Sequence, residues 1–128
     1  MLADSKAYNG FAVDDLGKAR EFYEGTLGIA TETLDEENGL IVLKLAGGRD
    51  TLVYIKEDHV PATYTVLNFP VDDVEATVDG LVERGVSFER YDQFPQDERG
   101  IVTEGGPRVA WFRDPAGNIL SVLEQPDE

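Results

Sequence analysis

The chain has 128 residues and a formal net charge of −15 at pH 7, with 26 acidic and 11 basic side chains. This length suits one domain with a real core, while an acidic surface repels phosphate groups and attracts cations, which argues against nucleic acid or anionic membrane as a partner. The chain contains no cysteine, which excludes disulfides, thiolate metal sites and a cysteine nucleophile.

The chain begins MLADSKAYNG, which has no positively charged region followed by an apolar stretch. We therefore expect no secretory signal. No apolar run reaches the roughly 18 residues that a membrane span requires. A cytoplasmic protein is the expectation that follows.

The first half of the chain predicts a strand, a helix and three further strands. Residues 7–13 are rich in β-branched and aromatic side chains, as strands are. Asp14 and Asp15 follow, where aspartate is favoured as a helix N-cap. Apolar side chains then recur at the helical period, which predicts one buried helix face: Leu16, Ala19, Tyr23 and Leu27. Gly28 suits the helix end, and strands are expected at 30–35, 39–46 and 51–57.

The second half repeats this pattern. FPVDDV (69–74) matches FAVDDL (11–16), and ILSVLEQ (119–125) aligns with LVYIKED (52–58). We expect a strand at 64–71, and then a helix whose buried face contains Val74, Val78, Leu81 and Val82. Gly85 follows that helix, and further strands are expected at 86–90, 108–113 and 118–124.

Each half is therefore a β-α-β-β-β module, and the two modules form one α+β domain over residues 1–128. The first module spans about 5–58 and the second about 63–126. Residues 91–107 (YDQFPQDERGIVTEGGP) have no counterpart of that length in the first half. A loop this long is usually functional or disordered, so a lid over a cavity and a floppy insertion both stay open.

These motifs resemble a known family. The doubled module, with VDDLGKAREFYEGTLG at 13–28 and WFRDPAGNILSVLE at 111–124, is similar to the vicinal oxygen chelate (VOC) superfamily. That superfamily includes glyoxalase I, bleomycin-resistance proteins, fosfomycin-resistance enzymes and extradiol dioxygenases. The resemblance covers essentially the whole chain and implies the fold, with two modules enclosing a concave cavity. It does not imply one activity, since one fold hosts many functions.

In catalytic members of the family, a divalent metal is held by His, Glu or Gln at four equivalent strand positions. The resemblance carries these positions over to Tyr8, Tyr54, Val66 and Ser121, although a one-residue slip would replace Tyr54 by Val53 or Ile55. Such side chains do not form a transition-metal site, which needs imidazole or carboxylate donors. We therefore expect no metal and no cofactor.

Two other potential ligands lie off these positions. His59, the single histidine, belongs to the Glu57–His59 linker between the modules. Strand alternation places Glu124 on the face opposite Ser121. Neither position suits the metal site that the resemblance implies.

Strand alternation predicts which side chains face the cavity. They form four groups: Tyr8, Gly10 and Ala12; Val66, Asn68 and Pro70; Leu52, Tyr54 and Lys56; and Ile119, Ser121 and Leu123, with Trp111 beside them. The candidate ligand-binding residues are Tyr8, Tyr54, Lys56, Val66, Asn68, Trp111 and Ser121. A mostly apolar surface with a few polar groups is typical of a small-molecule pocket. The alternative is that these aromatic side chains simply fill the core, although Asn68, as a buried amide, would then need partners.

The leading hypothesis is a metal-free protein, similar to the bleomycin-resistance branch, that sequesters or senses a small aromatic or cationic molecule. The alternative is a metal-independent enzyme of the lyase or isomerase type. In it, Tyr8 or Tyr54 would act as acid or base, while Lys56 favours the phenolate or polarises a carbonyl. A third possibility is a structural or regulatory module. The resemblance also implies a homodimer.

Overall fold

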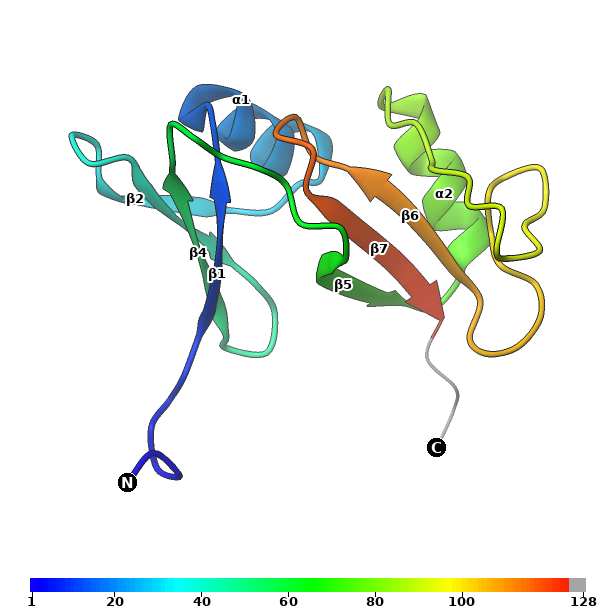
Figure 1. The fold of residues 1–128 in the computed structure, drawn as a ribbon, viewed down its shortest axis with the longest axis horizontal. Coiled ribbons are helices and arrows are strands. Elements are labelled where there is room, and N and C mark those ends of the chain that lie inside the picture. Colours follow the sequence, from blue (N-terminus) through cyan, green and yellow to red (C-terminus); the bar gives the residue numbers. More distant parts are fainter. Residues whose placement is uncertain (125–128) are drawn as a thin grey trace. The chain divides into compact units, whose positions relative to one another are not determined.

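The computed structural model describes residues 1–124 and contains two β-sheets, each in its own compact unit (Figure 1). One unit comprises Met1–Val60 and the other begins at Pro61. The division falls in the linker between the two expected modules, of which residues 125 and 126 lie outside the described part. No helix in that part is long and apolar enough to cross a membrane.

The first unit contains a four-stranded sheet in the order β1-β4-β3-β2. Strand β1 (Asn9–Val13) runs parallel to β4 (Asp50–Ile55). Strand β3 (Leu40–Lys44) is antiparallel both to β4 and to β2 (Thr31–Asp35). The expected strands are therefore present, each slightly shorter than the sequence pattern suggested.

The helix of the first unit begins where the paired aspartates predicted. The Asp15 carboxylate accepts a hydrogen bond from the Lys18 N–H at 3.0 Å, which caps α1 (Leu16–Arg20). The helix then widens into a π-helical segment, η1 (Glu21–Thr26). Tyr23 in this segment is fully buried, and its ring centroid lies 6.0 Å from that of Phe11 in β1. This contact joins the helix to the sheet.

The second unit contains a three-stranded sheet in the order β5-β7-β6. Strand β5 (Thr65–Val71) is parallel to β7 (Ile119–Glu124), and β6 (Val109–Arg113) is antiparallel to β7. The Asp73 carboxylate caps α2 (Val74–Glu83) by accepting a hydrogen bond from the backbone N–H of the third residue after it, at 3.0 Å. This helix packs on one face of the sheet (Figure 1).

The core of the second unit lies between α2 and the sheet. Alternate residues of β6 and β7 are buried on the helix side, and Val74 and Val78 of the helix are also buried. The buried strand residues are Ala110, Phe112, Leu120 and Val122. The other face of the same strands is therefore left for the site.

The prediction of a strand at 86–90 is wrong. The segment makes only one isolated bridge, from Phe88 to Phe112, and the Glu89 N–H donates to the Trp111 carbonyl at 2.8 Å. The chain then leaves the edge of β6. The Arg90 guanidinium donates to the carbonyls of Asp97 and Glu98 in the following loop, both at 2.6 Å. A favourable strand composition was overridden by contacts with a segment further along the chain.

The long loop after this bridge is internally bonded rather than a floppy insertion. The Gln96 amide accepts from the Tyr91 N–H at 2.7 Å and donates to the carbonyls of Glu89 and Gly100 at 3.0 and 2.8 Å. Ile101, a residue of the loop itself, is fully buried. These contacts fix the part of the loop that begins at Tyr91.

Candidate functional site

Three of the predicted site residues form one line across the second sheet. Ser121 of β7 is paired in register with Asn68 of β5 on one side and with Trp111 of β6 on the other. The Ser121 hydroxyl is fully buried and donates to the Asn68 side-chain oxygen at 2.6 Å. These residues lie on the sheet face turned away from α2, so the strand alternation that was expected for them holds in this sheet.

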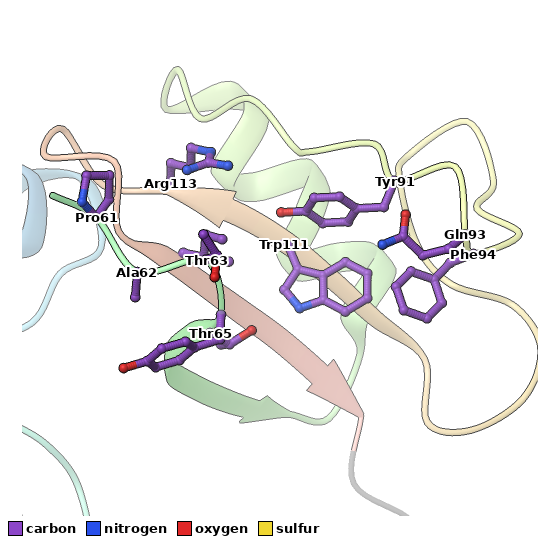
Figure 2. Close-up of a pocket in the computed structure, with 11 residues that line it drawn as sticks. Pro61, Ala62, Thr63, Thr65, Tyr91, Gln93, Phe94, Trp111 and Arg113 are labelled. Carbon is purple, nitrogen blue, oxygen red and sulfur yellow. The ribbon is translucent and has the colours of Figure 1, made fainter.

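A pocket of about 360 Å³ opens beside this line (Figure 2). Its floor is the row Thr65–Ile119–Arg113, which is paired across β5, β7 and β6, together with Trp111. The first residues of the second unit, ahead of β5, and the start of the long loop form its walls, which comprise Pro61, Ala62, Thr63, Tyr64, Tyr91, Gln93 and Phe94. The volume lies in the range of small-molecule sites.

Aromatic rings form one wall of the pocket. The Trp111 ring lies 5.2 Å from the Tyr91 ring, at an interplanar angle of 74°, and 5.3 Å from the Phe94 ring, at 33°. These are edge-on and tilted contacts of the kind that stabilise aromatic clusters. Phe94 is nevertheless 43% exposed, so the cluster borders solvent instead of filling a closed core.

The lining has several polar side chains: Thr63, Tyr64, Thr65, Tyr91, Gln93 and Arg113. The Tyr91 hydroxyl is buried and has no hydrogen-bond partner among residues 1–124. Burial raises the pKa of Tyr91 above its ordinary value, the negative Glu89 raises it further, and the positive Arg113 opposes them. Tyr91 is therefore a neutral O–H donor at neutral pH.

Arg113 is held by partners at the edge of the pocket. Its Nε pairs with the Glu89 carboxylate, and its Nη1 donates to the Gly117 carbonyl at 2.9 Å. The pair largely neutralises the positive charge, so the pocket carries little net charge of its own.

The residues at the four expected metal-ligand positions do not suit a metal. Tyr8 is 70% exposed ahead of β1, Tyr54 is half-buried in β4, and the Ser121 hydroxyl is already bonded to Asn68. Val66 offers no donor atom. In the described part of the chain, no three His, Asp or Glu side chains gather in a group that would hold a metal ion. The donor chemistry therefore does not fit the metal that the family resemblance implies.

The candidates of the first unit lie in a different setting. Tyr8 borders a polar pocket of about 550 Å³ formed by Ser5–Tyr8 and Gly47–Asp50. Lys56 is exposed and pairs with Asp58, whose pKa it lowers through that hydrogen bond and its charge. The Lys56 ammonium thus has a carboxylate partner two residues along the chain.

Two positions in β5 differ from the expected cavity floor. The register shifts between Thr65 and Leu67, so that Thr65 is the residue opposite Ile119 and Val66 falls at the irregularity. Such a bulge breaks the strict alternation from which Val66 was placed. Asn68 is exposed rather than a buried amide of a closed core, and it accepts the hydrogen bond from Ser121.

Sequence reasoning missed most of the residues that line this pocket. It named Trp111 and Ile119, but not Tyr91, Phe94 or Arg113. The one available signal was the presence of aromatic residues in the otherwise polar loop at 91–107. Loops have no periodicity that assigns a direction to each side chain, so this signal could not be converted into a site.

Comparison with known proteins agrees with the architecture. The family model described as Glyoxalase/Bleomycin resistance protein/Dioxygenase superfamily matches residues 7–122. A relative from Bacillus subtilis (strain 168), the uncharacterized protein YraH, is 32% identical over 125 residues, which is 88% of this chain and 91% of the relative.

Solved structures of low sequence identity share the fold. TnmS3, an antibiotic-binding protein from Streptomyces sp. CB03234, aligns with a TM-score of 0.67 at 24% identity, covering 96% of this chain and 98% of that one. The fosfomycin resistance protein FosX from Listeria monocytogenes aligns with a TM-score of 0.66 at 18% identity, covering 98% of this chain and 94% of that one. At these identities the likeness concerns the fold alone.

Proposed function

Because the chain belongs to the glyoxalase/bleomycin resistance protein/dioxygenase superfamily, we propose that it binds a small planar aromatic molecule in the pocket beside Trp111 and sequesters or senses it. The observation that carries this proposal is the pocket itself, with Trp111, Tyr91 and Phe94 along one wall and a volume of about 360 Å³. Aromatic walls favour planar ligands through stacking and edge contacts.

The lining offers little for catalysis. It contains no Asp, Glu, His or Lys, and its one charged side chain, Arg113, is engaged by Glu89 and Gly117. General acid–base chemistry needs a group that gains and loses a proton near the working pH. Tyr91, whose pKa is raised by burial, remains protonated in that range. These features support binding over the metal-independent lyase or isomerase considered from the sequence.

The lining also bears on the charge of the ligand. A net charge of −15 attracts cations toward the protein over long distances. Inside the pocket, however, the charged side chain is the guanidinium of Arg113. We therefore propose that aromatic character, rather than positive charge, selects the ligand, and that any cationic group of the ligand stays at the solvent side.

The single tryptophan of the chain makes this proposal directly testable. Trp111 lies in the pocket, so its emission reports occupation of that site. We expect planar aromatic probes such as quinoline and naphthalene to change this emission saturably and to raise the melting temperature by mass action. Ni²⁺, Zn²⁺, Mn²⁺ and Fe²⁺ are expected to do neither. A strong stabilisation by one of these metals, or no response to any planar probe, would contradict the proposal.

Replacing Trp111 with alanine should weaken binding of the same probes at least about 30-fold, since aromatic side chains at the centre of a site often contribute this much. The affinities are measured by titration calorimetry, because the variant lacks the fluorescent reporter. Val82→Ala is a suitable control, as Val82 is exposed on α2, away from the pocket. Equal affinity of Trp111→Ala and wild type would place the ligand elsewhere.

A further inference from the structure

The Tyr91 hydroxyl is the polar group of the pocket that simple aromatic binding does not explain. Its oxygen is shielded from solvent, and no residue in the described part of the chain serves as its hydrogen-bond partner. A buried hydroxyl without a partner raises the free energy of the folded state. Groups of this kind in a native protein call for a functional explanation.

Contacts of both the backbone and the ring of Tyr91 hold this hydroxyl in place. The Tyr91 N–H donates to the Gln96 side-chain oxygen at 2.7 Å, which ties the backbone to the loop. The ring packs edge-on against Trp111, with the centroids 5.2 Å apart. The side chain therefore has little freedom to turn toward another partner, and the position of its oxygen is set by the fold.

None of the side chains around the hydroxyl in the described part of the chain forms a hydrogen bond with it. Figure 2 shows the Tyr91 ring extending from the loop into the pocket, with its hydroxyl oxygen at the end that points toward Arg113 and Thr63. Arg113 has only donors, and the Glu89 carboxylate, which pairs with the Arg113 Nε, makes no hydrogen bond to the phenol. What the hydroxyl lacks is a hydrogen-bond acceptor in bonding position.

Resting on the proposed aromatic pocket, we propose that Tyr91 selects planar aromatic ligands that carry a neutral hydrogen-bond acceptor, such as a ring nitrogen or a carbonyl oxygen. The rings of such a ligand lie against Trp111, and its acceptor receives the Tyr91 O–H. Ligands that present only an ammonium group or a plain hydrocarbon edge leave the hydroxyl unpaired.

The Tyr91 oxygen is shielded in the free protein, so a ligand that pairs with it shifts a neighbouring side chain as it enters.

The test compares two ligands of the same shape. Quinoline and naphthalene differ only by a ring nitrogen in place of a C–H, so their affinity ratio isolates the acceptor. For wild type we expect quinoline to bind about tenfold more tightly, which corresponds to one hydrogen bond to a donor that water does not satisfy in the free protein. Dissociation constants are measured by ligand-observed NMR titration.

The variant Tyr91→Phe removes the hydroxyl and keeps the ring. We expect it to bind naphthalene as wild type does, to lose about tenfold in quinoline affinity, and to melt at the same or a higher temperature, because an unpaired buried hydroxyl has been removed. Naphthalene thus serves as the internal control for the integrity of the pocket.

The outcomes separate the two proposals. If both probes bind wild type equally, or if Tyr91→Phe keeps the wild-type ratio, the role of Tyr91 is overturned while the aromatic pocket stands. If neither probe binds wild type, the proposed function fails, and the selection by Tyr91 fails with it.

Discussion

Replacing Phe112 with alanine is expected to lower the free energy of unfolding of the second unit by about 3–5 kcal/mol. The ring is 1% exposed, lies on the helix-facing side of β6, and has its centroid 5.4 Å from that of Phe88. Alanine would leave a cavity under α2, and close-packed neighbours fill such a space only in part. Urea denaturation followed by circular dichroism measures the loss.

The matched control is the adjacent residue on the other face of the same strand. Trp111→Ala removes a larger ring, but one that borders the solvent-accessible pocket. It should therefore cost less stability than Phe112→Ala while removing ligand binding. If Phe112→Ala cost less than about 1 kcal/mol, or less than Trp111→Ala, the assignment of the core to the helix side would be wrong.

Replacing Asp114 with alanine should lower the free energy of unfolding by about 2–4 kcal/mol, because the carboxylate organises the turn between β6 and β7. Its Oδ1 accepts from the backbone N–H groups of Ala116 and Asn118, both at 2.9 Å, and its Oδ2 accepts from the Asn118 amide at 3.0 Å. Asp114 and Asn118 are both buried, so the donors left behind would be shielded from water. Thermal and urea denaturation both report the loss.

A chemically similar turn in the first unit provides the control. The Asp35 carboxylate accepts from the backbone N–H of Asn38 at 3.0 Å and from its side-chain amide at 2.6 Å, but this turn is exposed. In Asp35→Ala, water replaces the lost acceptor, so we expect a much smaller loss of stability. Equal losses in the two variants would show that burial of the Asp114 turn is not the cause.

The repeated module was readable from the sequence because its signals are local. Asp15 and Asp73 cap helices that begin within a residue of where the FAVDDL and FPVDDV motifs predict them. Capping depends on hydrogen bonds to N–H groups three residues away, so it does not depend on how distant parts of the chain pack. Strand alternation likewise placed Asn68 and Ser121, which pair in register, on one face of the second sheet.

Two features of the second unit differ from what strand alternation and strand composition predicted. The bulge between Thr65 and Leu67 moved Thr65, not Val66, opposite Ile119. The expected strand at 86–90 was reduced to a bridge at Phe88, since the chain beyond it is drawn to another segment. Both departures depend on contacts with residues outside the strand itself, which the composition of the strand does not reveal.

The sequence by itself determined the α+β module, its duplication, and the unsuitability of Tyr8, Tyr54, Val66 and Ser121 as metal ligands, because periodicity, capping and donor chemistry belong to each residue and its near neighbours. Only the tertiary structure decided that the loop after Phe88 folds back on Trp111 and leaves the Tyr91 hydroxyl buried in the pocket wall without a partner among the described residues. The packing of a loop depends on which other parts of the fold it contacts, and neither hydrophobic periodicity nor residue propensity predicts those contacts.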